Sequence, residues 1–230
     1  RESFRVHDWG SGRLYRFVLP GPELADSEWR RCLTVVSDLL APGTVLLVSG
    51  SLPPGMPVDM AARLARTARE VGARLLVDIS GPAMHAALAE GVFMVRFNRP
   101  EFEEYVGRPM ADIDERGDEA ERLVAAGAAE VVVATIGADG ALIVSRDGRM
   151  HLRPPQVVAA SPVGAGDSMM GAICLGLAHG WDMETACGLG VVAAAAAHLT
   201  PGTGLCRRSD VARMYEEMTG RPAPAPVGGP

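Results

Sequence analysis

The chain has 230 residues, and 22 cationic residues against 28 acidic ones give it a formal net charge of −6. Because every cationic residue is an arginine, a Walker-type P-loop and lysine Schiff-base chemistry are both excluded. The acidic balance also argues against binding along nucleic acid, which needs a basic face, so no nucleic-acid partner is expected.

The first predicted element is a β-hairpin over residues 3–19, in which two strand-like segments flank the turn residues WGSG. No helix directly adjoins it in the sequence, so we expect a flap rather than a part of the core. The segment PGPELADSEW then leads into a helix, capped by Asp26 or Ser27 and with Glu28 in its first turn.

Short apolar runs then alternate with helical patterns, which is typical of a parallel α/β sheet with right-handed crossovers. The runs cover residues 44–50, 74–80, 92–97 and 130–137. The helical patterns between them cover residues 58–72, 83–91, 99–106 and 113–126. The last predicted elements are an antiparallel hairpin over 140–152 that turns at Asp147-Gly148, and helices near 165–179, 182–199 and 209–219.

The sequence predicts a cytoplasmic protein with no membrane partner. Its most apolar run, residues 186–197, is rich in glycine and alanine and is shorter than the ~20 residues that a membrane span needs. The four cysteines are scattered without a C-x-x-C pair, which predicts free thiols in a reducing compartment and no zinc site. The chain starts at Arg1 without an apolar targeting stretch, and we expect it to be the remainder of something longer.

The strongest functional signal is SPVGAGDS, residues 161–168, in one of the loops beyond the predicted strands, where open parallel sheets bind ligands. Gly164, Ala165 and Gly166 precede a predicted helix, whose N-terminal N–H groups and dipole would hold an anion without any lysine. Asp167 lies at the rim, where a carboxylate would accept the proton of a substrate hydroxyl while the amides hold a transferring phosphoryl group. The alternative is a tightly packed helix start in which Asp167 only favours the helix dipole.

Three weaker motifs lie in neighbouring loops. Asn98 and Glu101 in NRPE stand three residues apart, where an oxygen-bearing pair would suit Mg²⁺ held largely through water. Taken alone, this motif favours an ordinary helix start with an asparagine cap and an acidic first turn. The loops SGSLPPG (49–55) and ATIGADG (134–140) are by themselves typical of turns. Core or surface roles are expected for the helical histidines, His198 among them.

Taken together, GSLPPG, NRPE, TIGADGAL and SPVGAGDS, in this order and spacing, resemble the PfkB (ribokinase-like) carbohydrate kinases. The resemblance covers about residues 1–219 and is closest to the phosphosugar kinases, the minor 6-phosphofructokinase type in particular. It implies a ribokinase-like α/β fold, with a mostly parallel central sheet flanked by helices. The implied organisation is a partial β lid over 1–20, a core with the nucleotide half and the catalytic loop over 21–219, and a flexible tail over 220–230.

The resemblance also implies roles for individual residues. Asp167 would be the catalytic base, and the anion hole for the γ-phosphate of ATP would be formed by Gly164, Ala165 and Gly166. The nucleotide would be bound by Arg96, Asn98, Thr135, Gly137, Gly140 and Val191. Asn98 and Glu101 would be tied to Mg²⁺. The phosphosugar would be contacted by Ser51, and its phosphate by Arg1. A monovalent-cation loop, with K⁺ as the ion, would correspond to Ser161, Val163, Ala197, Thr200, Gly202 and Gly204.

Two departures from the family pattern matter. Arg96 stands where the family often has lysine, and its planar guanidinium need not hold phosphate in the same geometry. The N-terminal part of the family pattern would precede Arg1, with an aspartate that binds sugar hydroxyls, a Gly-Gly element and half of the lid.

These features predict an ATP-dependent, Mg²⁺-using kinase of a phosphosugar, with the 1-hydroxyl of fructose 6-phosphate as the main expectation. A 1-phosphofructokinase, a tagatose-6-phosphate kinase and an inactive nucleotide-binding fragment are the open alternatives. A dinucleotide oxidoreductase is poorly supported, because no G-x-G-x-x-G follows the early strands. A lone two-stranded flap is marginal in water, so we expect a partner to cover it. The resemblance implies a homodimer through the lid.

Overall fold

The computed structural model describes residues 2–161 and 163–225, and these form one main sheet and one separate hairpin. The strands are Ser3–Asp8 (β1), Arg13–Val18 (β2), Val45–Ser49 (β3), Arg74–Asp78 (β4), Val92–Phe97 (β5), Ala129–Thr135 (β6), Ala141–Ser145 (β7) and Gly148–Leu152 (β8). The main sheet has the order β3-β4-β5-β6-β7-β8, in which β3 to β6 are parallel and β7 and β8 are antiparallel to their neighbours. This confirms the mostly parallel α/β fold. The β7–β8 turn is at residues 146–147, one residue earlier than predicted, because Gly148 pairs with Ser145.

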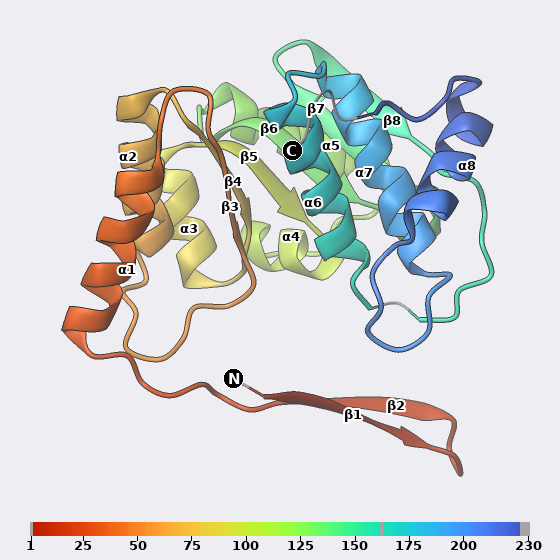
Figure 1. Ribbon diagram of the computed structural model, residues 1–230, viewed down its shortest axis with the longest axis horizontal. Helices are drawn as coiled ribbons and strands as arrows, with labels where there is room; N and C mark the ends of the chain where they lie inside the picture. The colour runs from red at the N-terminus through yellow and green to blue at the C-terminus, as the bar shows by residue number, and fades with distance from the viewer. Residues whose placement is uncertain (1, 162, 226–230) are drawn as a thin grey trace.

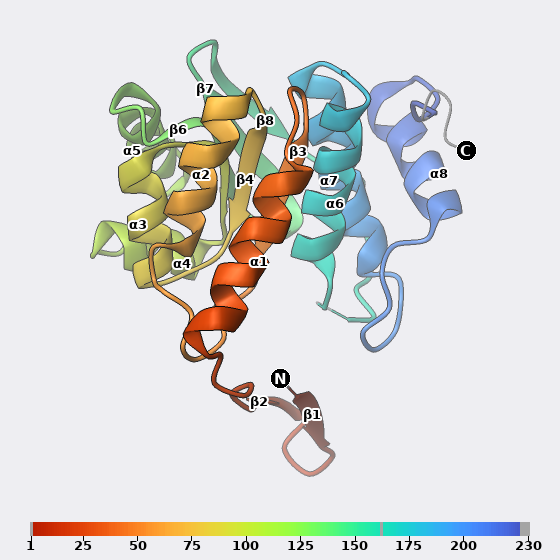
Figure 2. The same ribbon diagram turned by 60° about the vertical axis from the view of Figure 1, so that its left-hand side comes forward.

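Helices cover both faces of the main sheet, as Figure 1 and Figure 2 show. They are Asp26–Leu39 (α1), Met60–Val71 (α2), Pro82–Glu90 (α3), Arg99–Val106 (α4), Ile113–Ala125 (α5), Ala165–Ala178 (α6), Met183–Ala197 (α7) and Arg208–Thr219 (α8). Crossovers of one hand place α2 to α5 on the same face, where they bury Val77 and Val132. The opposite face, with Leu76 and Met94, is covered by α6 and α7, and α8 packs on α7. Both faces are buried because successive strand residues point to opposite sides, which explains the continuous apolar runs in the sequence.

The predicted cap of the first helix is wrong. Ala25 precedes the helix with an extended backbone, and Asp26 and Ser27 are its first two residues. The Ala25 N–H donates to the carboxylate of Glu28, 2.7 Å away. The acid of the first turn therefore satisfies the N–H of the residue that precedes the helix, and Ala25 offers no capping side chain of its own.

The packing of α6 on α7 depends on glycine where the two backbones approach each other. A Cβ atom on Gly190 of α7 would lie 2.5 Å from Cγ1 of Ile173 and 3.0 Å from the carbonyl oxygen of Met169, both in α6. A Cβ atom on Gly171, also in α6, would meet no atom within 4 Å. The two glycines therefore differ only in the space around them, not in the type of element that holds them.

We expect Gly190→Ala to lower the free energy of unfolding by about 2 kcal/mol, because the added methyl group has to displace Ile173. Gly171→Ala is the matched control and should raise it by up to about 1 kcal/mol, since alanine is the better helix former. Urea unfolding followed by circular dichroism measures both changes. Equal effects of the two substitutions would contradict this account of the helix packing.

The hairpin of β1 and β2 projects from the rest of the chain (Figure 1) and carries an exposed apolar face. Phe4 pairs with Phe17 and Val6 pairs with Tyr15 across the two strands, so the four side chains share one face. The rings of Phe4 and Phe17 stack with their centroids 5.1 Å apart. Each of the four residues is nevertheless 43% to 49% exposed. A surface that covered this face would stabilise the hairpin.

The four cysteines are free thiols, as predicted. Burial raises the pKa of Cys174 to about 11 and that of Cys187 to about 12, so neither thiol is a ready nucleophile at neutral pH. None of the helices within the described residues combines the length and the apolar character needed to cross a bilayer. The cytoplasmic location stays a prediction.

Candidate active site

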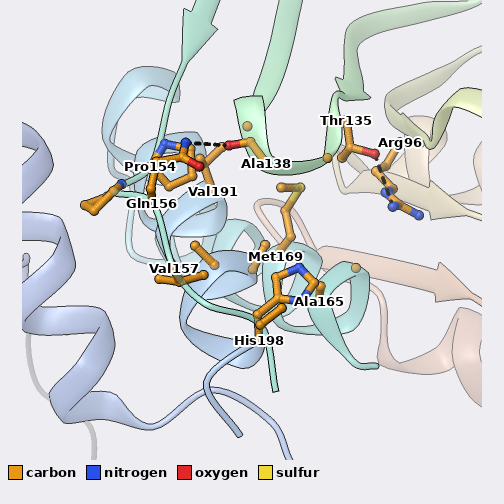
Figure 3. Close-up of a pocket in the computed structure, with 17 residues that line it drawn as sticks. Arg96, Thr135, Ala138, Pro154, Gln156, Val157, Ala165, Met169, Val191 and His198 are labelled. Carbon is orange, nitrogen blue, oxygen red and sulfur yellow. Dashed lines mark hydrogen bonds between the residues drawn. The ribbon is translucent and has the colours of Figure 1, made fainter. Parts of the chain in front are cut away.

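One cavity of about 340 Å³ lies at the carboxyl ends of β5 and β6, and its other walls come from the segment after β8 and from helices α6 and α7 (Figure 3). The carboxyl ends of β3 to β6 lie at the same edge of the sheet, which is why segments far apart in the sequence converge there. The cavity is lined by seven of the predicted site residues, namely Arg96, Thr135, Gly137, Gly140, Ala165, Gly166 and Val191. Much of the remaining wall is apolar, with Pro154, Val157 and Met169 among its side chains. An apolar wall that carries a few polar side chains, Arg96 among them, suits a ligand that has a flat apolar part and a charged part.

The N-terminus of α6 opens into one end of this cavity. Gly164 precedes the helix with a φ of +76°, a left-handed conformation that favours glycine. The Ser168 N–H donates to the Gly164 carbonyl oxygen at 2.8 Å and closes the first turn of the helix. The N–H groups of residues 165–167 come earlier, so they have no acceptor within the helix. Asp167, the third residue of α6, is exposed, and its carboxylate has no bonded partner among the described residues. The helix mouth therefore combines a partial positive charge with a free carboxylate.

A buried arginine lies against this helix mouth. Nη1 of Arg96 is 3.1 Å from Oδ1 of Asp78 and 3.6 Å from Oε2 of Glu101. Its Nη2 is 3.3 Å from Oγ1 of Thr135. A Cβ atom on Gly166 would be 3.3 Å from Nη1, so the guanidinium lies in contact with the helix backbone. The side chain is 14% exposed, and its buried Nε has no hydrogen-bond partner within the described part of the chain. An anion at the helix mouth would gain both the amide groups and this guanidinium.

Asn98 and Glu101 cap helix α4. Oδ1 of Asn98 accepts from the Glu101 N–H at 2.9 Å, and Oε2 of Glu101 accepts from the Asn98 N–H at 2.8 Å. In the described residues, no three side chains of His, Cys, Asp or Glu gather where they could hold a metal ion. Mg²⁺ keeps several waters and binds through one or two carboxylates plus phosphate oxygens. Glu101 and Asp78 therefore fit Mg²⁺ only in the company of a phosphate chain.

Of the two residues predicted on the sugar side, the structure describes only Ser51. Ser51 follows β3 and is exposed, and it is not one of the residues that line the cavity. Arg1 lies outside the described residues. Of the residues predicted for the nucleotide, all except Asn98 line the cavity, and Ser51 is not among the lining residues.

The residues predicted for a monovalent-cation loop lie together around the C-terminal end of α7. The Ser161 hydroxyl donates to the carbonyl oxygen of Gly202 at 2.7 Å and accepts from the Val163 N–H at 3.2 Å. The Thr200 N–H donates to the carbonyl oxygen of Ala197 at 3.1 Å. The loop is therefore held together by its own hydrogen bonds.

Three residues of the site were missed in the sequence. Asp78 ends β4, and its carboxylate, 10% exposed, pairs with Arg96. An acid at the end of an apolar run, where a parallel strand ends, is a sequence signal that could have found it. His198 follows α7 and lines the cavity, although a core or surface role was expected for it. Gln156 donates from Nε2 to the carbonyl oxygen of Ala138 at 3.2 Å across the cavity rim (Figure 3), and nothing in the sequence pointed to it.

The glycine-rich helix mouth and the loops around it are shared with a known family. The family model described as pfkB family carbohydrate kinase matches residues 12–210. The chain belongs to the pfkB family of carbohydrate kinases. The resemblance read from the four loop motifs is thereby confirmed.

Relatives of this pfkB family chain include two kinds of phosphofructokinase. It is 39% identical over 216 residues to ATP-dependent 6-phosphofructokinase isozyme 2 of Mycobacterium tuberculosis strain H37Rv, with 94% of the chain and 63% of that relative covered. It is 31% identical over 211 residues to a 1-phosphofructokinase of Escherichia coli K12, with 92% and 67% covered. The chain therefore spans less than two thirds of the length of the M. tuberculosis relative.

The fold agrees with a solved structure of the same pfkB family. The crystal structure of phosphofructokinase-2 from E. coli in complex with potassium superposes with a TM-score of 0.89 at 38% identity. The match covers 95% of this chain and 71% of that chain. The predicted ribokinase-like α/β architecture is confirmed by this likeness.

Proposed function

We propose that this chain is the nucleotide-binding and catalytic part of an ATP-dependent phosphosugar kinase. The observation that carries the proposal is the helix mouth at residues 164–167. Ala165 and Gly166 line the cavity, the Arg96 guanidinium lies against Gly166, and the next residue, Asp167, has an exposed carboxylate. The relative named 6-phosphofructokinase supports fructose 6-phosphate as the acceptor, phosphorylated at its 1-hydroxyl to give fructose 1,6-bisphosphate.

In this proposal the cavity holds ATP along its length. The adenine ring occupies the apolar part beside Val191, where Gly137 and Gly140 allow the backbone to approach the nucleotide closely. The phosphate chain extends towards α6, and the γ-phosphoryl group lies against residues 164–166.

The proposed chemistry is an in-line transfer. The sugar O1 attacks the γ-phosphorus, the bond from that phosphorus to the β–γ bridging oxygen breaks, and ADP leaves with the electron pair. The Asp167 carboxylate accepts the proton of the attacking hydroxyl. The amide groups at the helix mouth and the Arg96 guanidinium stabilise the charge on the transferring oxygens. Glu101 and Asp78 would hold Mg²⁺ through water beside the phosphates, and the ion supplies charge neutralisation when it is bound.

A substrate panel tests this function. The protein is mixed with Mg·ATP and, in turn, with fructose 6-phosphate, fructose 1-phosphate and tagatose 6-phosphate, and the release of ADP is measured. Turnover with fructose 6-phosphate that is at least about tenfold faster than with the others is the expected result. Faster turnover with fructose 1-phosphate would select the second candidate, which the 1-phosphofructokinase relative favours. ATP binding without turnover on any sugar would identify a nucleotide-binding piece, and no ATP binding would overturn the proposal.

The same proposal assigns the β1–β2 hairpin to a lid that also forms a contact between two copies of the chain. Its support is the face of Phe4, Val6, Tyr15 and Phe17, which is exposed although it is apolar. Sedimentation equilibrium measures the oligomeric state, and a protein that stays monomeric at micromolar concentration would contradict this assignment.

Arg96 should bind the phosphates of ATP and not its adenosine part. We expect Arg96→Gln to weaken the binding of Mg·ATP by about tenfold, because a guanidinium that faces the helix mouth is lost, and to leave adenosine affinity within about twofold. Isothermal titration calorimetry measures both affinities. Arg63→Gln is the control, because the half-exposed Arg63 of α2 pairs with Asp59 at 3.0 Å and does not line the cavity. If adenosine affinity falls as far as ATP affinity, the role of Arg96 is structural.

A further inference from the structure

We propose that Gln156 recognises the group at position six of the purine base, so that this chain binds a nucleotide with an amino group there in preference to one with an oxo group. The inference rests on the proposed function, which places a purine nucleotide in the cavity. It concerns the base and not the phosphates.

Gln156 is the polar side chain that the phosphate end of the cavity leaves free. The described residues that line the cavity include four with strongly polar side chains, namely Arg96, Thr135, Gln156 and His198. Arg96 lies against Gly166 at the helix mouth, and Thr135 is 3.3 Å from the guanidinium. His198 is held to Ser161, in the segment that leads into α6. In Figure 3, Gln156 lies on the Val191 side of the cavity, away from Arg96.

A hydrogen bond fixes the orientation of the Gln156 amide. The carbonyl oxygen of Ala138 can only accept, so the group 3.2 Å from it is the Nε2 donor of Gln156. The planar amide therefore carries Oε1 on its other side. No donor to that oxygen is found among the described residues. The rim of the cavity thus presents a side-chain acceptor next to the turn at 137–140.

A second side chain holds the same turn. Nε2 of His151 lies 2.9 Å from the carbonyl oxygen of Asp139, which also can only accept, so His151 is the donor. Two successive carbonyl oxygens of the turn are therefore held by β8 and by the segment that follows it. The amide of Gln156 is attached to a turn that has its own support, which limits the positions that Oε1 can take.

An acceptor in this place distinguishes the two common groups at position six of a purine. The amino group of adenine would donate a hydrogen bond to Oε1, whereas the oxo group of hypoxanthine or guanine would bring a second oxygen against it. Gln156 is exposed, so water replaces part of a lost bond. We therefore expect a preference of about fivefold, the effect of one ordinary hydrogen bond.

Calorimetric titration with Mg·ATP and with Mg·ITP tests the inference. The two nucleotides share the ribose and the phosphates and differ at position six and at the adjacent ring nitrogen. We expect the Kd for Mg·ATP to be about fivefold lower than the Kd for Mg·ITP. Equal affinities would overturn the inference.

Two variants show whether Gln156 is the reason for the preference. Gln156→Leu removes the acceptor, and the two affinities should then agree within about twofold. Gln156→Arg presents only donors at the same place and should prefer Mg·ITP. Circular dichroism shows that the variants are folded. A preference for Mg·ATP that persists in both variants would overturn the role of Gln156.

His151→Phe is the matched control. It removes the hydrogen bond to Asp139 in the same turn, but His151 does not line the cavity. The two affinities should fall together, so that their ratio is unchanged. A ratio that collapses as it does in Gln156→Leu would show that the preference comes from the position of the turn, and it would overturn a direct contact with Gln156.

The outcomes separate this inference from the proposed function. If both nucleotides bind equally well and the phosphosugar is phosphorylated, the kinase function stands and the role of Gln156 fails. If the expected preference is found without turnover on any sugar, the role of Gln156 stands and the kinase function fails. If neither nucleotide binds, both are overturned.

Discussion

Asp167→Asn is expected to lower kcat by about 10²–10⁴ and to leave the affinity for Mg·ATP within about threefold. The carboxylate is exposed at the mouth of α6 and has no partner among the described residues, so it is free to take a proton from an incoming hydroxyl. Asparagine has nearly the same shape but cannot accept that proton. Steady-state kinetics with saturating fructose 6-phosphate measure kcat, and calorimetry measures the ATP affinity.

Asp210→Asn is the matched control for this substitution. Asp210 is also an acid at the third position of a helix, α8, and it lies 3.8 Å from Arg213. It contributes to the dipole of its helix as Asp167 does, but no residue of α8 lines the cavity, whereas Ala165 and Gly166 of α6 do. Loss of turnover only in Asp167→Asn separates proton transfer from an effect on a helix start. Full turnover by Asp167→Asn would refute the assignment of the base.

Gly140→Ala is expected to lower the free energy of unfolding by about 4 kcal/mol and to abolish measurable ATP binding. Gly140 has φ +88° and ψ −125°, a conformation that alanine does not adopt without strain. A Cβ atom there would lie 2.0 Å from the carbonyl oxygen of Leu152 and 2.8 Å from Cδ of Pro154. The backbone of the turn at 137–140 would have to move, and this turn lines the cavity.

Gly137→Ala in the same turn is the control for the effect of the added methyl group. Gly137 also has a positive φ, +62°, but a Cβ atom there would meet no atom within 4 Å. Gly137→Ala should therefore lower the free energy of unfolding by only about 1 kcal/mol, because backbone strain is the only penalty. Urea unfolding compares the two variants. Similar losses of unfolding free energy would show that the clash of the added Cβ atom with Leu152 is unimportant.

Most of the fold could be predicted because its signals are local. Apolar runs marked β3 to β6, and residue spacing marked α2 together with the glycine that ends it, Gly72, whose φ is +73°. The glycine-rich start of α6 was equally visible, since the conformation of Gly164 is a property of a few consecutive residues. Cap positions were less predictable, as Ala25 shows, because several side chains near a helix start can satisfy the same N–H group.

Asn98 and Glu101 show where local information ends. The sequence allowed either a helix cap or an ion-binding pair, and in the structure both residues cap α4. Glu101 also lies 3.6 Å from Arg96, which no spacing rule indicated. A capping role and a role beside phosphates are therefore compatible for Glu101, and its part in binding Mg²⁺ stays a prediction.

By itself, the sequence determined the order of strands and helices, the family and the helix mouth with its acid, because each depends on short stretches of chain. Only the tertiary structure decided which groups surround that mouth. Arg96 meets Asp78, 18 residues away, and Thr135, 39 residues away, and His198 meets Ser161, 37 residues away. These contacts exist because parallel strands and two packed helices bring distant segments to one edge of the sheet, and side-chain pairs of that kind have no periodicity in the sequence.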